Sequence, residues 1–543
     1  MPHPQVVERL ARLTPDQRAA ATAPAGPVLC VAPAGSGKTT TLVARIAWLV
    51  DGGADPATIA AITFNKRAAE ELSERADVAL EPLGIETGAV RVRTFHALGR
   101  EILRDAGHRV DALLDRADLL AELWPRTTLA ERSRLDTAFS RLKLDLAVTA
   151  SHVAADPDAG SIARAFIAYE TALRDRGAID FDDLVRGALQ ALEADAGLLA
   201  RWRERCTHLL VDEVQDVDRS QLRLALLLAA PANRIFLVGD DDQSIYGWRL
   251  ADVRRVLAIG ASLPGLRRID LQVNHRCPAP VVDRAVRLIG HNHERFDKVI
   301  RPREDAPGSV ILAPDADDEP GRTTRLLRSW PHDDGTRAVL ARTNRELRPA
   351  VLAAMALGIA FRAPSVELLV DQPGLDTLLD RVDVETSPSL PLLIRLGSFR
   401  TSLPVEPWSD RELAAALLAW APPYPDLDAL RAAIAATRTR LAELRREDAP
   451  LSLATAHSTK GAEFDHVAVV GLEEGRFPSE RAVADAEDPS RAYEEERRLG
   501  YVAWTRARRT LTLSYDPAVP SPFLLEAFSP EELGIASAAL HND

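Results

Sequence analysis

The sequence is poor in lysine, aromatic residues and cysteine. Lysine occupies only five of the 67 basic positions, and Phe, Trp and Tyr make up 5% of the 543 residues. Three cysteines without a CxxC pair exclude a disulfide scaffold and disfavour a zinc site, so we expect a reducing cytoplasmic location. No apolar run reaches the length of about 18 residues that a membrane span needs. The first 17 residues lack the apolar core of a secretory signal, so none is expected.

The charge balance also gives weak evidence about partners. The formal net charge is −13, which opposes nucleic-acid binding at long range. A local basic groove would overrule that effect in a chain of this length. The arginine-rich composition matches a codon bias, under which lysine persists where the planar guanidinium cannot replace it. Three of the five lysines (Lys38, Lys66 and Lys460) fall in the motifs described below, whereas Lys143 and Lys298 do not.

Short aliphatic runs alternate with helical patterns along most of the chain. This alternation predicts α/β domains with parallel sheets covered by helices. The runs fall in two groups, before about residue 280 and after about residue 310, so two domains are expected. The expected strands include Val28–Val31, Ala60–Phe64, Leu209–Val211, Ile235–Val238, Ala338–Leu340 and His466–Gly471.

Two stretches without strands interrupt the alternation. Residues 99–200 have a nearly continuous helical pattern. Residues 372–448 begin with prolines and end in an amphipathic helix with Leu427, Leu430, Ile434, Leu441 and Leu444 on one face. We therefore expect one α/β domain over 1–98 and 201–280 and a second over 281–371 and 449–528. Each would carry a mainly helical insertion, and residues 529–543 would form a tail.

The segment APAGSGKT at residues 32–39 is the strongest local signal. It follows an expected strand and opens the helical pattern Thr40–Val50, which is the context of a phosphate-binding P-loop. Its glycines allow backbone amides to surround phosphates, Lys38 would reach the β- and γ-phosphates, and the Thr39 hydroxyl would bind Mg²⁺. The expected nucleotide-binding residues here are Ala34, Gly35, Ser36, Gly37, Lys38, Thr39 and Thr40.

An acidic pair follows the expected strand Leu209–Val211. Asp212 and Glu213 would stand at the carboxyl edge of the sheet, where carboxylates suit metal binding and water activation. Downstream of a P-loop, we predict that Asp212 holds Mg²⁺ with Thr39 and that Glu213 is the base for the attacking water.

A series of segments resembles, in order, the motifs of UvrD/Rep/PcrA-type superfamily 1 helicases. The resemblance covers about residues 10–310 and 335–525. Besides the P-loop, the segments are LTPDQ at 13–17, TFNKR at 63–67, TFHAL at 94–98, DEVQD at 212–216, GDDDQSIYGWR at 239–249, NHR at 274–276, HSTKGAEF at 457–464, EERRL at 495–499 and TRA at 505–507.

The resemblance implies two RecA-like P-loop motor domains that hydrolyse ATP with Mg²⁺. It implies that Gln17 reads adenine, that Glu463 contacts the ribose and that Gln243 senses the γ-phosphate. Arg276 and Arg506 would stabilise the charge that develops on the γ-phosphate, with Arg506 as an arginine finger supplied within the chain. Both arginines would act across the cleft between the domains.

The resemblance also implies movement 3′→5′ on single-stranded DNA and unwinding at junctions of single- and double-stranded DNA. Aromatic rings that stack on bases bind without sequence preference. Trp248 is the strongest candidate because it is a scarce residue in a polar loop, while Tyr246 fits stacking and core packing equally well. The expected DNA contacts are Phe64, Arg67, Thr94, His96, Tyr246, Trp248, Arg249 and His457.

The sequence departs from the family pattern at several positions. Pro33 removes one amide from the P-loop, His275 replaces a tyrosine and Gly247 replaces a frequent arginine. Residues 372–448 are much shorter than the family's usual 2B insertion and lack its glycine-containing duplex contact. A second hypothesis is therefore a DNA-dependent ATPase that works with a partner protein, such as a nuclease or a factor of repair, recombination or defence. An RNA substrate is a third hypothesis.

Overall fold

The computed structural model describes residues 2–144, 160–331, 333–403 and 408–534. The chain forms two compact units, described separately below. Unit 1 comprises Met1–Val282 and Ile289–Ala306, and unit 2 comprises Asp283–Leu288 and Pro307–Asp543. Within the described residues, no helix is long and apolar enough to cross a membrane.

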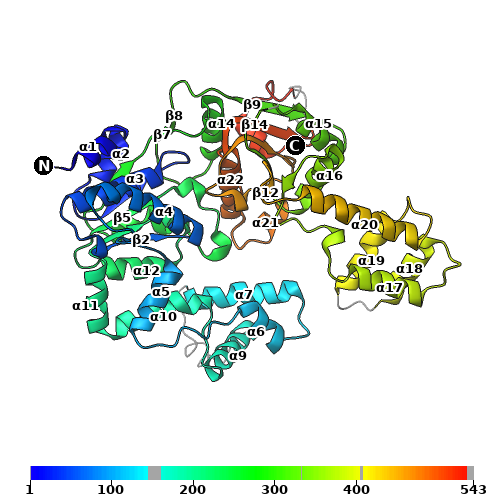
Figure 1. The fold of residues 1–543 in the computed structure, drawn as a ribbon, viewed down its shortest axis with the longest axis horizontal. Coiled ribbons are helices and arrows are strands. Elements are labelled where there is room, and N and C mark those ends of the chain that lie inside the picture. The colour runs from blue at the N-terminus through cyan, green and yellow to red at the C-terminus, as the bar shows by residue number, and fades with distance from the viewer. Residues whose placement is uncertain (1, 145–159, 332, 404–407, 535–543) are drawn as a thin grey trace. The chain divides into compact units, whose positions relative to one another are not determined.

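A six-stranded parallel sheet forms the centre of unit 1 (Figure 1). Its strand order is β3-β2-β4-β5-β1-β6, with Val28 opposite Phe236 and Ile62 opposite Val211 in neighbouring strands. The strands are β1 (Val28–Val31), β2 (Ile59–Thr63), β3 (Arg91–Thr94), β4 (His208–Val211), β5 (Ile235–Gly239) and β6 (Arg267–Asp270).

Alternate residues of the central strands contribute to two separate cores. Leu29 and Val31 pack with helices on one face, and Val28 and Cys30 pack with helices on the other. Burial on both faces explains why these strands are apolar without interruption. The flanking helices are α1 (Pro4–Ala11), α2 (Pro15–Ala21), α3 (Lys38–Asp51), α4 (Lys66–Leu80), α5 (Phe95–Asp105), α10 (Phe181–Ala194), α11 (Ala196–Arg205), α12 (Arg219–Ala229) and α13 (Val253–Leu257).

The helical stretch of unit 1 packs partly on the sheet and partly on itself. Helix α10 lies along α5, while α6 (Arg116–Leu123), α7 (Leu129–Leu144) and α9 (Ser161–Asp175) form a separate group with its own core (Figure 1). Phe139, Phe166 and Tyr169 are the large side chains of that core.

Unit 2 repeats the architecture with a second parallel sheet. Its strand order is β11-β12-β10-β13-β14-β9. The strands are β9 (Ser309–Pro314), β10 (Arg337–Ala341), β11 (Phe361–Arg362), β12 (Leu451–Thr455), β13 (Phe464–Val469) and β14 (Ala507–Tyr515). The helices around it are α15 (Glu319–Ser329), α16 (Arg348–Leu357), α21 (Glu480–Ala484), α22 (Pro489–Trp504) and α23 (Pro522–Ala527). The expected α/β fold with two RecA-like sheets is confirmed.

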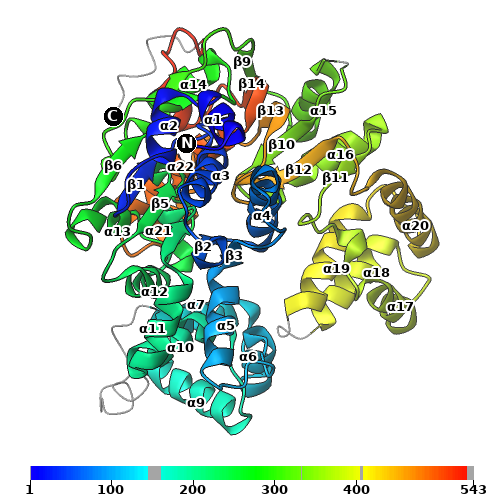
Figure 2. The same ribbon diagram turned by 60° about the vertical axis from the view of Figure 1, so that its left-hand side comes forward.

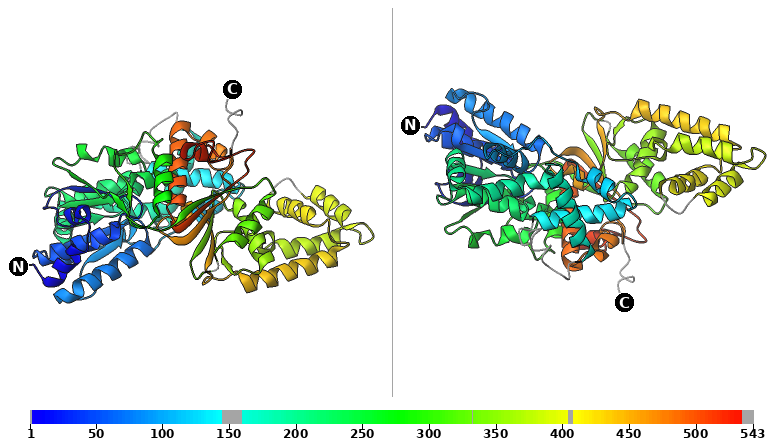
Figure 3. Two further views of the ribbon diagram at one scale, coloured as in Figure 1. Left: turned by 90° about the horizontal axis from the view of Figure 1, so that it is seen from above. Right: turned by 90° about the horizontal axis from the view of Figure 1, so that it is seen from below.

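In its described residues, the helical insertion of unit 2 is a small group of four helices, α17 (Leu375–Glu385), α18 (Leu392–Ser402), α19 (Trp408–Trp420) and α20 (Leu427–Leu444) (Figures 2 and 3). Helix α20 buries all five apolar residues that its pattern predicts. This group continues the core of the sheet on the side of α16.

Helix α14 (Ala279–Ile289) spans the division between the units. The sequence places residues 281–306 in the second domain, whereas the contacts of 289–306 group them with unit 1. Two features hold this segment there: strand β8 (Arg301–Pro302) pairs with β7 (Val273–Asn274), and Arg295 and Lys298 pair with aspartates of unit 1. The finer domain boundaries stay a prediction.

Candidate functional site

The P-loop connects β1 to α3, and its glycines adopt conformations that other residues avoid. Gly35 has φ 68° and Gly37 has φ 84°. A Cβ atom at Gly35 would lie 2.7 Å from Asn274 Oδ1 and 2.7 Å from Arg276 Cβ. The loop therefore packs directly against the turn that carries Arg276, and His275 N donates to Gly35 O at 2.8 Å. This packing places Arg276 beside the P-loop.

Lys38 opens α3 and pairs with Glu213. The distance from Lys38 Nζ to Glu213 Oε1 is 3.1 Å, and both side chains are largely buried. Glu213 has φ 51°, an unusual backbone conformation for a residue with a side chain. Strain of this kind is typical of functional positions. The proposed phosphate-binding cation and the proposed base therefore lie together at the carboxyl ends of β1 and β4.

Gln17 is held between its own helix and the P-loop. Its Nε2 donates to Ser36 O at 2.8 Å, and its Oε1 accepts from the backbone N of Thr14 at 3.1 Å in a capping box. These contacts place Gln17 against the phosphate loop. Adenine recognition by its remaining hydrogen-bonding capacity stays a prediction.

The acids after β4 connect to the loop after β5 through Gln215. Gln215 Nε2 donates to Glu213, and Gln215 Oε1 accepts from the backbone N of Asp240 at 2.9 Å. Gly239 leaves room for this contact, because a Cβ there would lie 2.2 Å from Gln215 Oε1. Asp240 Oδ2 in turn accepts from Gln243 Nε2 at 2.7 Å. A hydrogen-bonded chain thus runs from Lys38 to the proposed γ-phosphate sensor.

Three consecutive aspartates after β5 are buried together with Lys298, which the sequence motifs did not include. The side chain of Lys298 is 1% exposed, and its Nζ contacts Asp240, Asp241 and Asp242. Burial by itself lowers the pKa of Lys298, but attraction by the three carboxylates outweighs burial and leaves this pKa raised. The expectation that rare lysines mark special positions could have identified this residue.

The same loop continues into an aromatic surface. The rings of Phe64 and Tyr246 are stacked with centroids 5.2 Å apart, and Trp248 meets Tyr246 edge-on at 6.2 Å. Trp248 is 57% exposed, and the guanidinium of Arg249 lies 4.7 Å from its ring centre. An exposed indole beside stacked rings suits contact with bases. Tyr246 is half-buried, between the two alternatives that the sequence left open.

A second aromatic pair joins α5 to α10. Phe181 is 54% exposed and stacks on His96 at 4.1 Å. Burial lowers the pKa of His96 to about 4, and Asp182 only partly opposes this effect. Thr94 caps α5 through Ala97 N. The sequence reading missed Phe181, although its setting in DFDD within an aromatic-poor chain resembles the signal that identified Trp248.

Arg67 is the last of the expected DNA-contacting residues of unit 1. It is exposed in the first turn of α4. Its neighbour Asn65 caps that helix through Ala68 N. The chain therefore leaves β2, passes the aromatic surface at Phe64 and starts α4 with an exposed cation. Its contact with DNA stays a prediction.

The expected functional residues of unit 2 come from two different edges of its sheet. Arg506 is 1% exposed, and its Nε donates to Val502 O at 2.8 Å and its Nη1 to Ala462 O at 3.2 Å. Glu463 pairs with Arg508 at 3.4 Å. His457 follows β12, and burial together with Arg342 and Lys460 lowers its pKa to about 4. The structure places Arg506 and Glu463 side by side at the start of β13 and β14.

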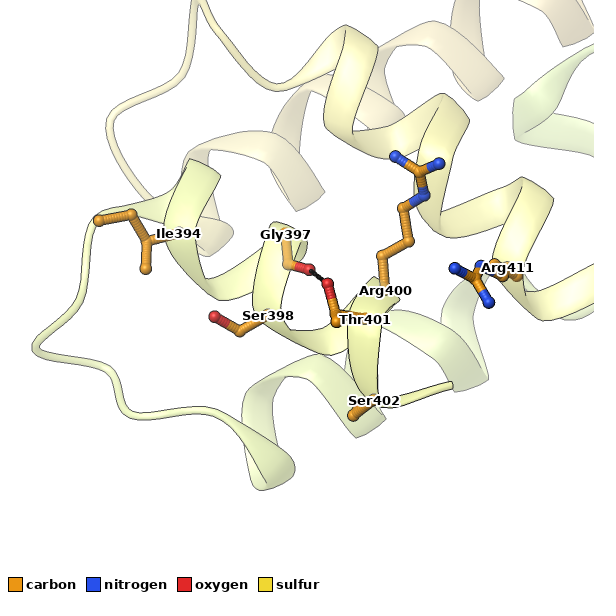
Figure 4. Close-up of a pocket in the computed structure, with 7 residues that line it drawn as sticks. All are labelled: Ile394, Gly397, Ser398, Arg400, Thr401, Ser402 and Arg411. Atoms are coloured by element: carbon orange, nitrogen blue, oxygen red, sulfur yellow. Dashed lines mark hydrogen bonds between the residues drawn. The ribbon is translucent and has the colours of Figure 1, made fainter. Parts of the chain in front are cut away.

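The insertion of unit 2 has a shallow hollow of about 920 Å³ (Figure 4). It is lined by Ile394, Gly397, Ser398, Arg400, Thr401, Ser402 and Arg411. Two guanidinium groups and the hydroxyl-bearing face of α18 give it a polar, basic character. Half-exposed apolar residues, including Leu393 and Ile394, lie on the same helix. All residues that line the hollow belong to unit 2.

Comparison with known proteins gives a consistent result for both units. The profile of the UvrD/REP helicase N-terminal domain matches residues 13–264, and that of the UvrD-like helicase C-terminal domain matches residues 426–517. ATP-dependent DNA helicase UvrD2 of Mycobacterium tuberculosis is 32% identical over 556 residues, covering 93% of this chain and 79% of the relative. DNA helicase II of Escherichia coli is 28% identical over 615 residues, covering 93% and 84%. ATP-dependent DNA helicase Rep of Escherichia coli is 28% identical over 639 residues, covering 95% and 94%.

Proposed function

The chain belongs to the UvrD-like helicases, and from this premise we propose that it is an ATP-dependent DNA helicase that moves 3′→5′ on single-stranded DNA. Its substrates are single strands and junctions of single- and double-stranded DNA. One observation carries the proposal beyond family membership: a single loop, residues 240–249, contributes both to the hydrogen-bonded chain from Lys38 and to the exposed aromatic surface. A shift of this loop would link nucleotide chemistry to the grip on the strand.

The nucleotide residues divide the work of ATP hydrolysis. The amides of the P-loop and Lys38 bind the phosphates, and Glu213 orients the attacking water and accepts its proton. Gln243 senses the γ-phosphate, while Arg276 and Arg506 stabilise charge in the transition state. Gln17 and Glu463 hold the base and the ribose.

The residues present fit a magnesium ion. Thr39 supplies a hydroxyl and Asp212 a carboxylate, and Mg²⁺ prefers such oxygen ligands together with waters and phosphate oxygens. Asp212 is fixed from both sides, since its backbone N donates to Ile62 O at 2.8 Å and its Oδ1 accepts from Glu213 N at 2.9 Å. Bound Mg²⁺ would neutralise charge on the β- and γ-phosphates.

The aromatic residues provide the grip on the strand. Bases stack on Trp248 and the neighbouring rings of Tyr246 and Phe64, and Phe181 on His96 offers a second platform. Arg67, Arg249, Thr94 and His457 approach the backbone. Stacking of this kind accepts any base, so binding is independent of sequence and weakens as salt rises.

Unwinding of tailed duplexes tests the function directly. The purified chain is mixed with ATP, Mg²⁺ and duplexes with a 3′ or a 5′ single-stranded tail. We expect strand separation only with the 3′ tail, and none without ATP. Separation from the 5′ tail alone would reverse the polarity, and RNA-tailed duplexes reveal any preference for RNA.

The reduced insertion favours a second candidate function, that of a translocase working with a partner protein. In residues 372–448, Val384 is 86% exposed and Leu390, Leu393 and Ile394 are between 42% and 50% exposed. Ile394 also lines the basic hollow. Contiguous exposed apolar patches with a polar rim mark protein interfaces. DNA-stimulated ATP hydrolysis without strand separation on either duplex would favour this candidate.

A further inference from the structure

Lys298 contacts the loop that carries Gln243, and its ammonium group has a carboxylate partner for each of its three N–H groups. Its Nζ is 2.9 Å from Asp240 Oδ1, 2.9 Å from Asp242 Oδ2 and in close contact with Asp241 Oδ1. An ammonium group has three N–H donors, so the three carboxylates match its capacity. All four side chains are essentially inaccessible to solvent.

Neighbours of Lys298 hold the same aspartates from the same segment. Arg295 binds Asp242 through two parallel hydrogen bonds of 2.9 and 2.8 Å. The backbone N of Phe296 donates to Asp241 Oδ2 at 2.8 Å. Residues 295–298 therefore hold every aspartate of the loop, and only Lys298 contacts Asp240 among these described contacts.

Asp240 is the member of the cluster that leads to the nucleotide site. Its Oδ1 faces Lys298 at 2.9 Å, and its Oδ2 accepts from Gln243 Nε2 at 2.7 Å. Its backbone N donates to Gln215, which donates to Glu213. One carboxylate thus fixes the side chain of the proposed sensor, and one backbone group connects it with the proposed base.

The chain contains a second buried lysine with the same kind of surroundings. Lys143 is also fully buried, and its Nζ contacts Glu170, Asp180 and Asp183 at 2.7 to 2.9 Å. These acids connect to Arg116 and Tyr169 inside the helical stretch of unit 1. Lys143 therefore matches Lys298 in burial and charge but lacks a hydrogen-bonded path to Glu213 among the described contacts.

We propose that Lys298 is a positioning residue for ATP hydrolysis, which holds Asp240 so that Gln243 and, through Gln215, Glu213 keep their working geometry. The inference rests on the proposed function. Lysine suits the place because one compact ammonium nitrogen directs its three N–H groups to three carboxylates, whereas the donors of arginine are spread over a larger planar group. Displacement of Asp240 would move the sensor and the base, and small displacements of catalytic groups are costly to the rate.

Lys298→Arg tests this directly, because it keeps the charge of the cluster and changes only the geometry. We expect the kcat for DNA-stimulated ATP hydrolysis to fall about 10- to 100-fold, while the KM for ATP and the affinity for a fluorescent ATP analogue change less than about threefold. A residue with only a structural role would lower the melting temperature without this separation of kcat from KM. Circular dichroism verifies the fold of each variant.

Lys143→Arg is the matched control. It should lower the melting temperature similarly while leaving kcat within about twofold at saturating oligothymidylate. A second variant, Lys298→Met with Asp241→Asn, keeps the net charge of the cluster and guards against a folding defect in the first. Two results would overturn the role of Lys298 but leave the proposed function intact. One is a folded Lys298 variant with the kcat of the wild type, and the other is a loss of kcat in Lys143→Arg equal to that in Lys298→Arg. A wild-type chain without DNA-stimulated ATP hydrolysis would overturn the proposed function as well.

Discussion

The two α/β units have the same architecture but place their expected nucleotide-binding residues at opposite edges of the sheet. In unit 1 the P-loop, Asp212 and the aspartates of residues 240–242 follow the carboxyl ends of β1, β4 and β5. In unit 2 Arg506 and Glu463 precede the amino ends of β14 and β13. The sheet order explains the first arrangement, because β4, β5 and β1 are neighbours and their loops meet at one place.

The fold alone does not decide which unit performs the chemistry. Both sheets are six-stranded and parallel, with apolar strands buried between helices. Unit 1 gathers acids and a phosphate loop, which suit metal binding and water activation. The proposed contribution of unit 2 is cationic, with Arg506 as its centre. Function follows from the residues at the strand ends. Substitutions in each unit should therefore affect different steps.

Lys38→Ala in unit 1 should have the largest effect. The substitution removes the cation that we propose binds the β- and γ-phosphates, and it also removes the ion pair of 3.1 Å with Glu213. We expect ATP turnover to fall by at least about 1,000-fold and affinity for a fluorescent ATP analogue to fall with it. Normal turnover in the folded variant would show that this loop is not the phosphate site.

Glu213→Gln should separate binding from hydrolysis within the same unit. The amide keeps the size of the side chain but cannot accept a proton, so turnover should fall about 100- to 1,000-fold. The affinity for the ATP analogue should stay close to that of the wild type. Loss of nucleotide affinity instead would assign Glu213 to metal binding or folding. Steady-state hydrolysis and fluorescence titration distinguish these outcomes.

Arg506→Lys tests the contribution of unit 2. Lysine keeps the charge but lacks the planar guanidinium group of arginine. We therefore expect kcat to fall about 100-fold, which is less than the full effect of removing an arginine finger. The affinity for ATP should be retained. Arg509→Ala is a suitable control, since Arg509 is 54% exposed and pairs with Asp333 and Asp465. A loss of the same size in both variants would mean that Arg506 acts through stability. If the wild type, Arg506→Lys and Arg509→Ala hydrolyse ATP equally fast, unit 2 does not contribute Arg506 to hydrolysis.

Trp248→Ala should weaken the grip on DNA and leave the nucleotide site intact. Loss of one stacking ring costs about 1–3 kcal/mol, or about 5- to 150-fold in affinity for single strands. ATP hydrolysis without DNA should be unchanged, and Trp248→Phe should recover part of the affinity. Fluorescence anisotropy with oligothymidylate measures the effect. An unchanged affinity for single-stranded DNA would show that Trp248 does not contact the strand.

The sequence predicts the central strands of unit 1 well because each is buried on both faces. β1 matches its expected range of Val28–Val31, and β5 extends only to Gly239. β3 carries two arginines in four residues at the sheet edge, so it has no apolar run to detect. The short strand β11 is likewise too brief to be detected from an apolar run. Edge positions and brief strands depend on tertiary packing, which the local pattern does not contain.

The candidate site divides in the same way. The placement of Lys38, Thr39, Asp212 and Glu213 beyond the ends of β1 and β4 could be predicted, because a glycine-rich loop and an acid pair each follow a recognisable strand. The roles of these residues stay predictions. Lys298 could not be placed, since its partners lie 56 or more positions earlier and no local pattern connects them. Its scarcity marked it as unusual, but only the fold shows the three aspartates around it. Long-range charge clusters have no period in the sequence.

The smallest expected effect is a pH dependence of stability, which a buried histidine causes in each unit. Burial lowers the pKa of His96 in unit 1 and of His457 in unit 2 to about 4, against an ordinary value of 6.5. The unfolded chain therefore binds more protons between these values, so stability is complete above about pH 6.5 and is lost as the pH falls towards 4. Each histidine should cost about 1 kcal/mol at pH 5.5. Gln at either position should flatten the dependence of the melting temperature on pH for its own unit alone, as calorimetry between pH 5.5 and 7.5 can measure. A change in both transitions from one substitution would mean that the units unfold together.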